Sequence, residues 1–229
     1  MNFQSVERYL PGFLHRHILN FEARIEAAVK QFAAALAPGA RVLDAGAGEG
    51  GHASFFSKQR YCGVDLAIGD ASWDYRHLDA VADLAAIPFQ AGCFDAAINI
   101  VTLEHVHEPA GALGEIARVL KPGGRLLLIV PQEWEVHQAP HDYYRFTRYG
   151  VRRLLEGAGF VDIHVLAAGG YFRLLSRRLL SGLQFFHGIW NVPAVLLLAL
   201  PALLLPALDF LDRDRNFTLG YLCTATKRW

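Results

Sequence analysis

Apolar residues recur along the chain with two spacings that alternate. From Phe21 to Leu36 they fall on every third or fourth position, which is typical of an amphipathic helix, and Pro38 and Gly39 end that segment. Further helical patterns occupy residues 51–59, 111–120 and 148–159. Short apolar runs or alternating patterns typical of strands occupy residues 41–44, 61–65, 94–100, 124–130, 161–167 and 217–227. This alternation predicts an α/β fold with a doubly wound, mostly parallel sheet that helices cover on both faces.

A long apolar stretch before the last strand interrupts the alternation. Ile189 to Leu208 carries no charge and is about as long as a membrane span. Three prolines, Pro193, Pro201 and Pro206, are expected to divide it into short helices, and its return to a strand of the same sheet argues against crossing a bilayer. Three roles stay open for this hydrophobic helical insertion: a lid over an acceptor pocket, a homodimer contact, or a patch lying on a membrane.

Charge near the insertion favours the membrane role. Between Arg145 and Arg178 there are seven arginines and two acids, Glu156 and Asp162. Basic residues beside an apolar helix favour an anionic lipid surface. A buried lid or dimer core with solvated arginines is the alternative.

Length and composition predict one domain in a reducing compartment. The 229 residues divide into an N-terminal helical segment (1–39), a core (40–168), the insertion (169–215) and a final strand (216–229). Lys plus Arg and Asp plus Glu both number 22, which disfavours a nucleic-acid partner. Three well-separated cysteines fit neither a disulfide framework nor a zinc site, and charges near the N-terminus argue against a signal peptide. We therefore expect a cytoplasmic protein, or one peripheral on the inner face of the membrane.

A glycine-rich loop, "VLDAGAGEGG" (residues 42–51), directly follows the first predicted strand. Such a loop lets the backbone approach a nucleotide closely. Asp65 comes 21 residues after Asp44, near the interval at which an acid at the second strand receives a ribose. Asp44 lies where a dinucleotide fold would bring a pyrophosphate, and its charge would repel phosphate. The pattern therefore favours a cationic ligand without phosphate, such as S-adenosylmethionine.

The chain resembles the class I S-adenosylmethionine-dependent methyltransferases. The resemblance covers roughly residues 41–160 and the final strand, and rests on "VLDAGAGEG", "GVDLA", "VADLAAIPFQAGCFDAAINIVTLEHV" and "EIARVLKPGGRLLLIVP". It implies a Rossmann-like sheet of seven strands and S-adenosyl-L-methionine as cofactor. The cofactor residues that it implies are Asp44, Gly46 and Gly48 at the methionine end, Asp65 and Leu66 at the ribose, Asp83 and Leu84 at the adenine, and Asn99 and Ile100 beside the methionine portion.

Some of these residues also have purely structural interpretations. Gly46 and Gly48 would serve equally as turn glycines, and Asp83 as a helix-capping acid. His105, which follows the fourth strand, either borders the cofactor or begins a helix.

The loop after the strand at residues 124–130, "PQEWEVHQAPHDYYRFTRYG", is the densest in chemistry. We select His141 as a candidate general base, with Tyr144 and Arg145 to shape or anchor the acceptor. A hydrogen-bonded structural role for His141 is the alternative. His137 and His141 are four residues apart, yet Pro140 between them argues against a regular helix, so no metal is predicted.

These observations predict a methyltransferase that acts on a small molecule. Similar "PHDYYRFT" stretches occur in related bacterial methyltransferases, some of them in cell-envelope glycan or lipid pathways, which favours a place for this stretch at the active site. We expect an amphiphilic, lipid-linked or glycan-linked acceptor. A nicotinamide-dependent oxidoreductase and a non-catalytic, membrane-associated scaffold are the alternatives.

Overall fold

The computed structural model describes residues 20–70 and 72–229, which divide into two compact units. One unit holds the sheet and comprises residues 25–166 and 221–229. The other holds a helical hairpin and comprises, among the described residues, 20–24 and 167–220. The sequence that argues against a signal peptide, residues 1–17, lies outside the described residues.

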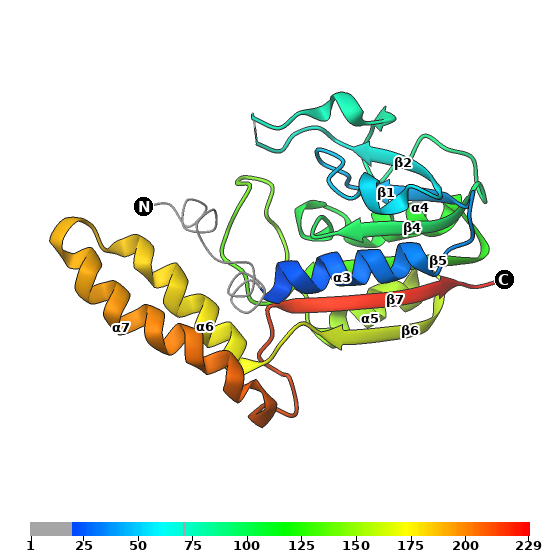
Figure 1. The fold of residues 1–229 in the computed structure, drawn as a ribbon. Coiled ribbons are helices and arrows are strands. Elements are labelled where there is room, and N and C mark those ends of the chain that lie inside the picture. The colour runs from blue at the N-terminus through cyan, green and yellow to red at the C-terminus, as the bar shows by residue number, and fades with distance from the viewer. Residues whose placement is uncertain (1–19, 71) are drawn as a thin grey trace. The chain divides into compact units, whose positions relative to one another are not determined.

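Seven strands form one sheet in the order β3-β2-β1-β4-β5-β7-β6. The strands are β1 (Arg41–Ala45), β2 (Arg60–Asp65), β3 (Ala80–Val81), β4 (Phe94–Ile100), β5 (Leu120–Pro131), β6 (Phe160–Ala167) and β7 (Gly220–Lys227). The pairs β1–β2, β1–β4, β2–β3 and β4–β5 are parallel. Figure 1 shows that β7 runs opposite to β6. The expected mostly parallel, seven-stranded sheet is thus confirmed.

Three helices flank the sheet: α3 (Asn20–Ala34), α4 (Pro109–Val119) and α5 (Arg148–Gly157). Figure 1 shows α3 on one face of the sheet and α4 with α5 on the other. Leu113 and Ile116, which the helical pattern of α4 places on one side, are fully buried. Thr147 caps α5, because its side-chain oxygen accepts a hydrogen bond from the Gly150 amide at 3.1 Å.

The centre of the sheet is the most deeply buried part of this unit. Leu43, Ala97 and Leu126 lie side by side across β1, β4 and β5, and none is exposed. Strands buried on both faces read as continuous apolar runs, as they do here. Since these strands are parallel, the loops that follow them emerge at one edge of the sheet.

The segment after the glycine loop does not form the expected helix. It makes a single 3-10 turn, η1 (Ala53–Phe56), before β2 begins at Arg60. Gly50 still has a positive φ of 73°, so the turn consumes residues that the helix would need. The few residues between Gly50 and β2 must carry the chain back along the length of β1, which has five residues. A 3-10 turn rises about 2.0 Å per residue, compared with about 1.5 Å for an α-helix, so it covers this distance with fewer residues.

The second unit is built around an antiparallel pair of helices, α6 (Tyr171–Gly182) and α7 (Asn191–Leu204). Short 3-10 turns join them, η4 (Leu183–Phe185) and η5 (Gly188–Trp190), and η6 (Leu205–Leu211) follows α7. The contact between the helices centres on Leu180 and Ala202, both buried. The Ser176 hydroxyl donates to the Ala202 carbonyl at 2.6 Å, which satisfies a buried polar group between the helices.

The prolines do not divide the apolar stretch as the sequence predicts. Pro193 lies in the first turn of α7, where a missing amide costs nothing, and the helix continues through Pro201. The helical segment Gly188–Leu211 has 24 residues, and its most apolar 18 residues have a mean hydropathy of 2.3, enough to cross a membrane by length and composition. Only 22% of its most apolar 18 residues are buried.

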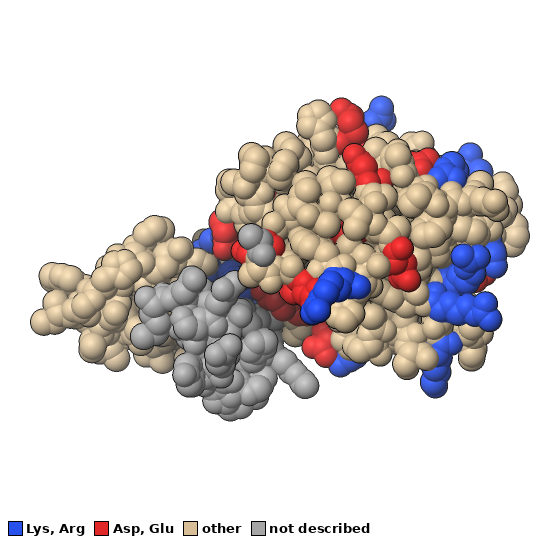
Figure 2. Space-filling view, turned by 90° about the horizontal axis from the view of Figure 1, so that it is seen from above, with Lys and Arg blue, Asp and Glu red and all other residues tan. Residues whose placement is uncertain are grey.

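Two of the arginines beside this stretch, Arg173 and Arg177, are engaged within the protein. The Arg173 guanidinium lies 3.2 Å from Asp209, and Arg177 donates to Glu22 at 2.7 Å. Arg177 is 6% exposed, so it is not available to a headgroup phosphate. The face of the hairpin seen in Figure 2 is tan over nearly all of its visible surface, so charged residues are scarce on that face.

Candidate active site

The loops at the carboxyl edge of the sheet enclose a cavity of about 450 Å³. This is within the range of small-molecule sites, which run from about 300 to 1,000 Å³. The loops after β1, β2, β3 and β4 line it, together with part of the loop after β5. Predicted site residues that line it are Gly46, Gly48, Asp65, Leu66, Asp83, Leu84, Ile100 and His141.

The glycine loop approaches its neighbours too closely for side chains. Gly46 has φ +93°, and a Cβ there would lie 2.2 Å from Cγ2 of Thr102. The Thr102 hydroxyl donates to the Gly46 carbonyl at 3.2 Å. Gly48 has φ +52°, and its amide donates to Oδ2 of Asp65 at 2.9 Å. Both glycines are therefore required by the turn itself, and both also border the cavity.

Asp44 is fully buried at the end of β1 and is not among the residues that line the cavity. The Tyr61 hydroxyl donates to its Oδ2 at 2.6 Å, while Oδ1 is buried with no hydrogen-bond partner among the described residues. Burial raises the pKa of Asp44 to about 7; the Asp65 charge acts in the same direction, and the Tyr61 hydrogen bond opposes it. A cationic or N–H group of a ligand would satisfy Oδ1.

Asp65 connects two loops at the cavity. Besides the Gly48 amide, its carboxylate accepts from the Ala67 amide at 2.8 Å. It is only half-buried and lines the cavity, so its remaining lone pairs are available to ribose hydroxyls. Leu66, next to it, is 43% exposed.

Asp83 and Leu84 follow β3 and line the same cavity. The Asp83 carboxylate accepts from the Ala85 amide at 2.8 Å, a local bond that stabilises a turn and not the helix that the structural interpretation expected. Leu84 is buried, as is Ile100 after β4, and both give the cavity apolar wall.

Asn99 does not reach the cavity. It is fully buried, and its Nδ2 donates to the Ala45 carbonyl at 2.6 Å, which ties β4 to the end of β1. Its Oδ1 is buried with no hydrogen-bond partner among the described residues, and its expected place beside the methionine portion of the cofactor stays a prediction.

Tyr144 and Arg145 are also placed outside the cavity lining. The Tyr144 hydroxyl donates to the His107 carbonyl at 2.9 Å. Arg145 forms a two-pronged ion pair with Asp142, at 2.6 and 2.9 Å, and donates to backbone carbonyls of Trp134 and Glu135. Because its donors are committed within the loop, Arg145 holds the loop together and is not available to anchor an acceptor.

His141 does line the cavity, beside Tyr143. Its Nδ1 lies 3.0 Å from the Tyr143 hydroxyl, and its backbone carbonyl lies 2.7 Å from Nδ1 of His105. Both the ring and the backbone of His141 thus have partners within this part of the site, and its role as a general base stays a prediction beside the structural alternative.

Sequence reasoning missed the aromatic side chains that close the cofactor side. Trp73 lies 3.3 Å from the position of a Cβ on Gly48 and lines the cavity. A Cβ on Gly69 would clash with Trp73 and Tyr75, so this glycine makes room for both rings. The available signal was a Trp and a Tyr, Trp73 and Tyr75, in the loop that follows Asp65.

Three ionisable residues meet beside the cavity, Glu104, His105 and His137, with side-chain ligand atoms all within 4.8 Å of one another. Burial raises the pKa of the Glu104 carboxyl to about 8 and lowers the pKa of His105. His105 also lines the cavity. In the sequence, His137 and His141 are the two histidines spaced like possible ligands of one ion. In the structure, the ring of His137 contacts the ring of His105 instead.

Comparison with known proteins agrees with this geometry. The family model for a methyltransferase domain matches residues 15–165. A ubiquinone biosynthesis O-methyltransferase of Nitrosococcus oceani is 31% identical over 139 residues, which cover 48% of this chain and 58% of that protein. A demethylmenaquinone methyltransferase of Renibacterium salmoninarum is 36% identical over 97 residues, which cover 40% and 41%. The chain thus spans about half the length of these curated relatives.

Solved structures share the fold at lower identity. The 1,6-didemethyltoxoflavin-N1-methyltransferase of Burkholderia thailandensis superposes with a TM-score of 0.53 at 19% identity, covering 95% of this chain and 86% of that one. Because the family model matches most of the chain, including every strand of the cavity edge, the chain belongs to the methyltransferase domain family.

Proposed function

We propose that this protein transfers a methyl group from S-adenosylmethionine to a small amphiphilic acceptor. The observation that carries the proposal is the cavity itself, whose lining brings the glycine loop, Asp65 and Leu84 together with His141 and Tyr143. This arrangement provides for a nucleoside with a cationic tail and, beside it, for an acceptor and a proton-accepting group.

The donor fits the side chains of its half of the cavity. Asp65 would accept from the ribose hydroxyls, and Gly46 would let the methionine end approach the backbone. Oδ1 of Asp44 offers an unpaired buried acceptor at the base of this loop. When bound, S-adenosylmethionine supplies an activated methyl group on a sulfonium.

His141 is the residue we propose to accept the acceptor's proton. A hydroxyl or amine acceptor must lose a proton as the new bond to carbon forms, and His141 is an imidazole that lines the cavity. Tyr143 contacts the ring of His141 and would orient it. Tyr144 and Arg145 act through the loop, since their polar atoms contact backbone carbonyls and Asp142.

We further propose that the hairpin of α6 and α7 seats the protein on a membrane. On α7 the residues facing α6 are small or partly buried, such as Ala194 and Ala202, while exposed apolar residues occupy more than half of its circumference. These exposed residues of α7 are Val192, Val195, Leu196, Leu197, Leu200 and Leu204, and Ile189 and Trp190 of η5, just before α7, are exposed as well. A dimer contact would bury one apolar face of α7, whereas lipid would contact every side of α7 that α6 leaves free. The wide apolar surface of α7 therefore favours lipid over a dimer contact.

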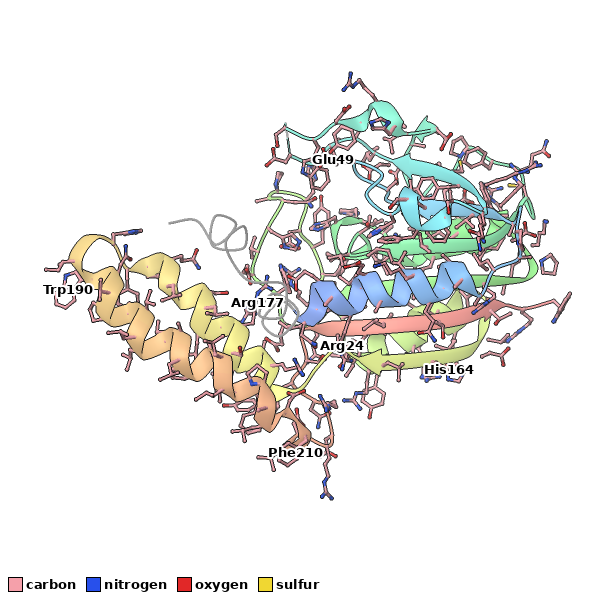
Figure 3. The ribbon with its side chains drawn as sticks, viewed as in Figure 1. Arg24, Glu49, His164, Arg177, Trp190 and Phe210 are labelled. Carbon is pink, nitrogen blue, oxygen red and sulfur yellow. The ribbon has the colours of Figure 1, made fainter. Side chains whose placement is uncertain are left out.

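The reach of the hairpin suits one leaflet. Residues 179–208 contain no Asp, Glu, Lys or Arg. In Figure 3 Trp190 marks the turn of the hairpin, and Phe210 lies at the other end. From residue 179 to the turn at 186 the chain rises about 12 Å, compared with about 15 Å for half of the hydrocarbon core. A monotopic insertion therefore fits better than a span, and it would hold the protein at the surface where amphiphilic acceptors collect.

Transfer of label from S-adenosylmethionine tests the acceptor class. The full chain is incubated with methyl-labelled S-adenosylmethionine and a bacterial extract separated into lipid, water-soluble small-molecule, glycan and protein fractions. We expect label in the lipid fraction, and none with the Asp65→Ala variant. Label confined to protein would contradict a small-molecule acceptor, and label only in the water-soluble fraction would contradict an amphiphilic one.

A further inference from the structure

The side chains of His105 and His137 approach each other with the same ring nitrogen. Nε2 of His105 lies 3.1 Å from Nε2 of His137. In each ring the other nitrogen faces a backbone carbonyl: Nδ1 of His105 lies 2.7 Å from the His141 carbonyl, and Nδ1 of His137 lies 3.0 Å from the Glu135 carbonyl. A carbonyl oxygen only accepts, so both Nδ1 atoms must carry hydrogen. In the neutral rings, therefore, two Nε2 lone pairs face each other.

A buried carboxylate completes this arrangement. Glu104 is fully buried, and neither carboxylate oxygen has a hydrogen-bond partner among the described residues. Its Oε1 lies 3.8 Å from Nε2 of His105, too far for a hydrogen bond. A buried carboxylate without a partner is costly, and two lone pairs that face each other repel. A cation between the three groups would remove both penalties.

We propose that Glu104, His105 and His137 bind a divalent transition-metal ion. Two imidazoles and one carboxylate form a donor set that suits zinc or iron(II) better than magnesium or calcium. Metal–ligand distances of about 2.0–2.2 Å in a tetrahedral site place neighbouring donor atoms about 3.3–3.6 Å apart. The 3.1 and 3.8 Å separations lie on either side of this range, and all three ligand atoms lie within 4.8 Å of one another, so the side chains would have to rotate to bring every pair into this range.

The surrounding loop holds both histidine rings in the orientation that such a site requires. Histidine ligands commonly donate their other N–H to a backbone carbonyl, as both do here. Asp142 accepts from the His137 amide at 2.9 Å and is fixed by Arg145. The role of Arg145 is thus to position His137 through Asp142.

The proposed ion borders the acceptor side of the cavity, because His105 also lines it. This role rests on the proposed function. Three protein ligands leave a coordination position for an acceptor oxygen, and coordination would lower the pKa of its hydroxyl. The hydroxyl proton would pass to His141 or water, the O–C bond would form as the S–C bond breaks, and neutral S-adenosylhomocysteine would remain.

Metal binding is measured directly, on full-length protein purified without a polyhistidine tag and treated with chelator. We expect one equivalent of Zn²⁺ to bind and to raise the melting temperature, and one equivalent of Co²⁺ to give the visible absorption of a tetrahedral ion. His137→Gln and Glu104→Gln should each lower the Zn²⁺ affinity by about 100-fold or more, since they remove ligands.

His164→Gln is the matched control. His164 is exposed on β6 and is drawn away from the cavity loops in Figure 3, so this variant should bind Zn²⁺ as the parent does. Glu104→Gln keeps the shape of the side chain, and circular dichroism verifies that it folds. Failure of the folded parent to bind one equivalent of Zn²⁺ or Co²⁺, or equal affinity in parent and Glu104→Gln, would overturn the proposal.

The same preparation separates this proposal from the proposed function. S-adenosylmethionine binding to the metal-free protein reports on the cofactor half of the cavity alone. Cofactor binding without metal binding would leave the methyltransferase proposal standing and refute the metal site. Metal binding without cofactor binding would support the metal site and refute the methyltransferase proposal.

Discussion

The Tyr61 hydroxyl donates a 2.6 Å hydrogen bond to Oδ2 of the buried Asp44. It satisfies one carboxylate oxygen from the neighbouring strand and leaves Oδ1 unpaired at the base of the glycine loop. The pair therefore makes the ionisation of Asp44 sensitive to whatever binds beside it.

Cofactor affinity should rise with pH around neutrality. The pKa of Asp44 is raised to about 7 by burial, with Asp65 acting in the same direction, and a cationic ligand prefers the ionised form. Binding should therefore release a proton below that pKa and tighten as pH rises from about 6 to 8. Calorimetry of S-adenosylmethionine binding in buffers of different ionisation enthalpy measures this release.

Tyr61→Phe provides the control for Asp44. It removes the hydrogen bond that lowers the Asp44 pKa, so the pH at which binding tightens should move upward. In the unliganded protein, stability should change with pH in the opposite direction to cofactor affinity. Between pH 3.8 and about 7 the folded state holds a proton on Asp44 that the unfolded state has lost. Its free energy of unfolding should therefore fall as pH rises through this window. Affinity independent of pH in both proteins would exclude Asp44 from cofactor binding.

Asp65→Ala should weaken S-adenosylmethionine binding by about 1.5–3 kcal/mol, because a charged acceptor of ribose hydrogen bonds is lost. Asp65 also accepts from the Gly48 and Ala67 amides, so part of the loss comes from a looser loop. Asp95→Ala is the matched control, since Asp95 also accepts a backbone amide, that of Arg41, but does not line the cavity. Equal affinities for the two folded variants would refute the assignment of Asp65.

His141→Ala should lower turnover on the true acceptor by about 100-fold or more and leave cofactor affinity nearly unchanged. Tyr144→Phe is the control variant in the same loop, because it removes only the hydrogen bond from the Tyr144 hydroxyl to the His107 carbonyl. That variant should lose about 1 kcal/mol of stability and keep most activity. A His141→Ala protein that melts lower but turns over normally would assign the ring a structural role.

The hairpin predicts lipid binding that resists salt. Its apolar exposed residues would enter the acyl region, while Arg173 and Arg177 are held by Asp209 and Glu22 and add little attraction to anionic headgroups. The protein should float with both neutral and anionic liposomes at low and high salt. Leu196→Asp with Leu200→Asp, both exposed on α7, should abolish flotation without unfolding the sheet unit.

Flotation has two informative contrary outcomes. Binding only to anionic liposomes and only at low salt would show that charge, not the apolar hairpin, holds the protein. A protein that never floats but forms a stable dimer, which the two Asp substitutions dissociate, would assign the hairpin to subunit contact.

Much of the sheet could be predicted from the sequence, because the apolar runs that indicate strands are also the segments that the fold buries. The run Phe94–Ile100 is β4 as predicted, and its residues from Ala96 to Ile100 are all buried. The segment after Gly50 could not be predicted in the same way, since the length left by the glycine turns, rather than apolar spacing, decides between a helix and a 3-10 turn. Pro201 shows the converse, a helix that continues where a local rule predicts a break.

Site residues were predictable where strand ends place them and less so within loops. Asp65 follows β2, so its position at the cavity comes directly from sheet geometry. Arg145 could be placed in the right loop, but whether it faces the cavity or Asp142 depends on how the loop folds back. The same holds for His105 and His137, which are 32 residues apart in sequence and meet only because the loops after β4 and β5 emerge side by side.

Cofactor selectivity tests the central claim most directly. Purified full-length protein is titrated calorimetrically with S-adenosylmethionine, S-adenosylhomocysteine and NADH at pH 8, where Asp44 is largely ionised. We predict that both S-adenosyl compounds bind with one-to-one stoichiometry, that Asp65→Ala weakens both, and that NADH does not bind. Binding of NADH with no binding of either S-adenosyl compound would contradict the methyltransferase assignment and favour a nicotinamide-dependent oxidoreductase.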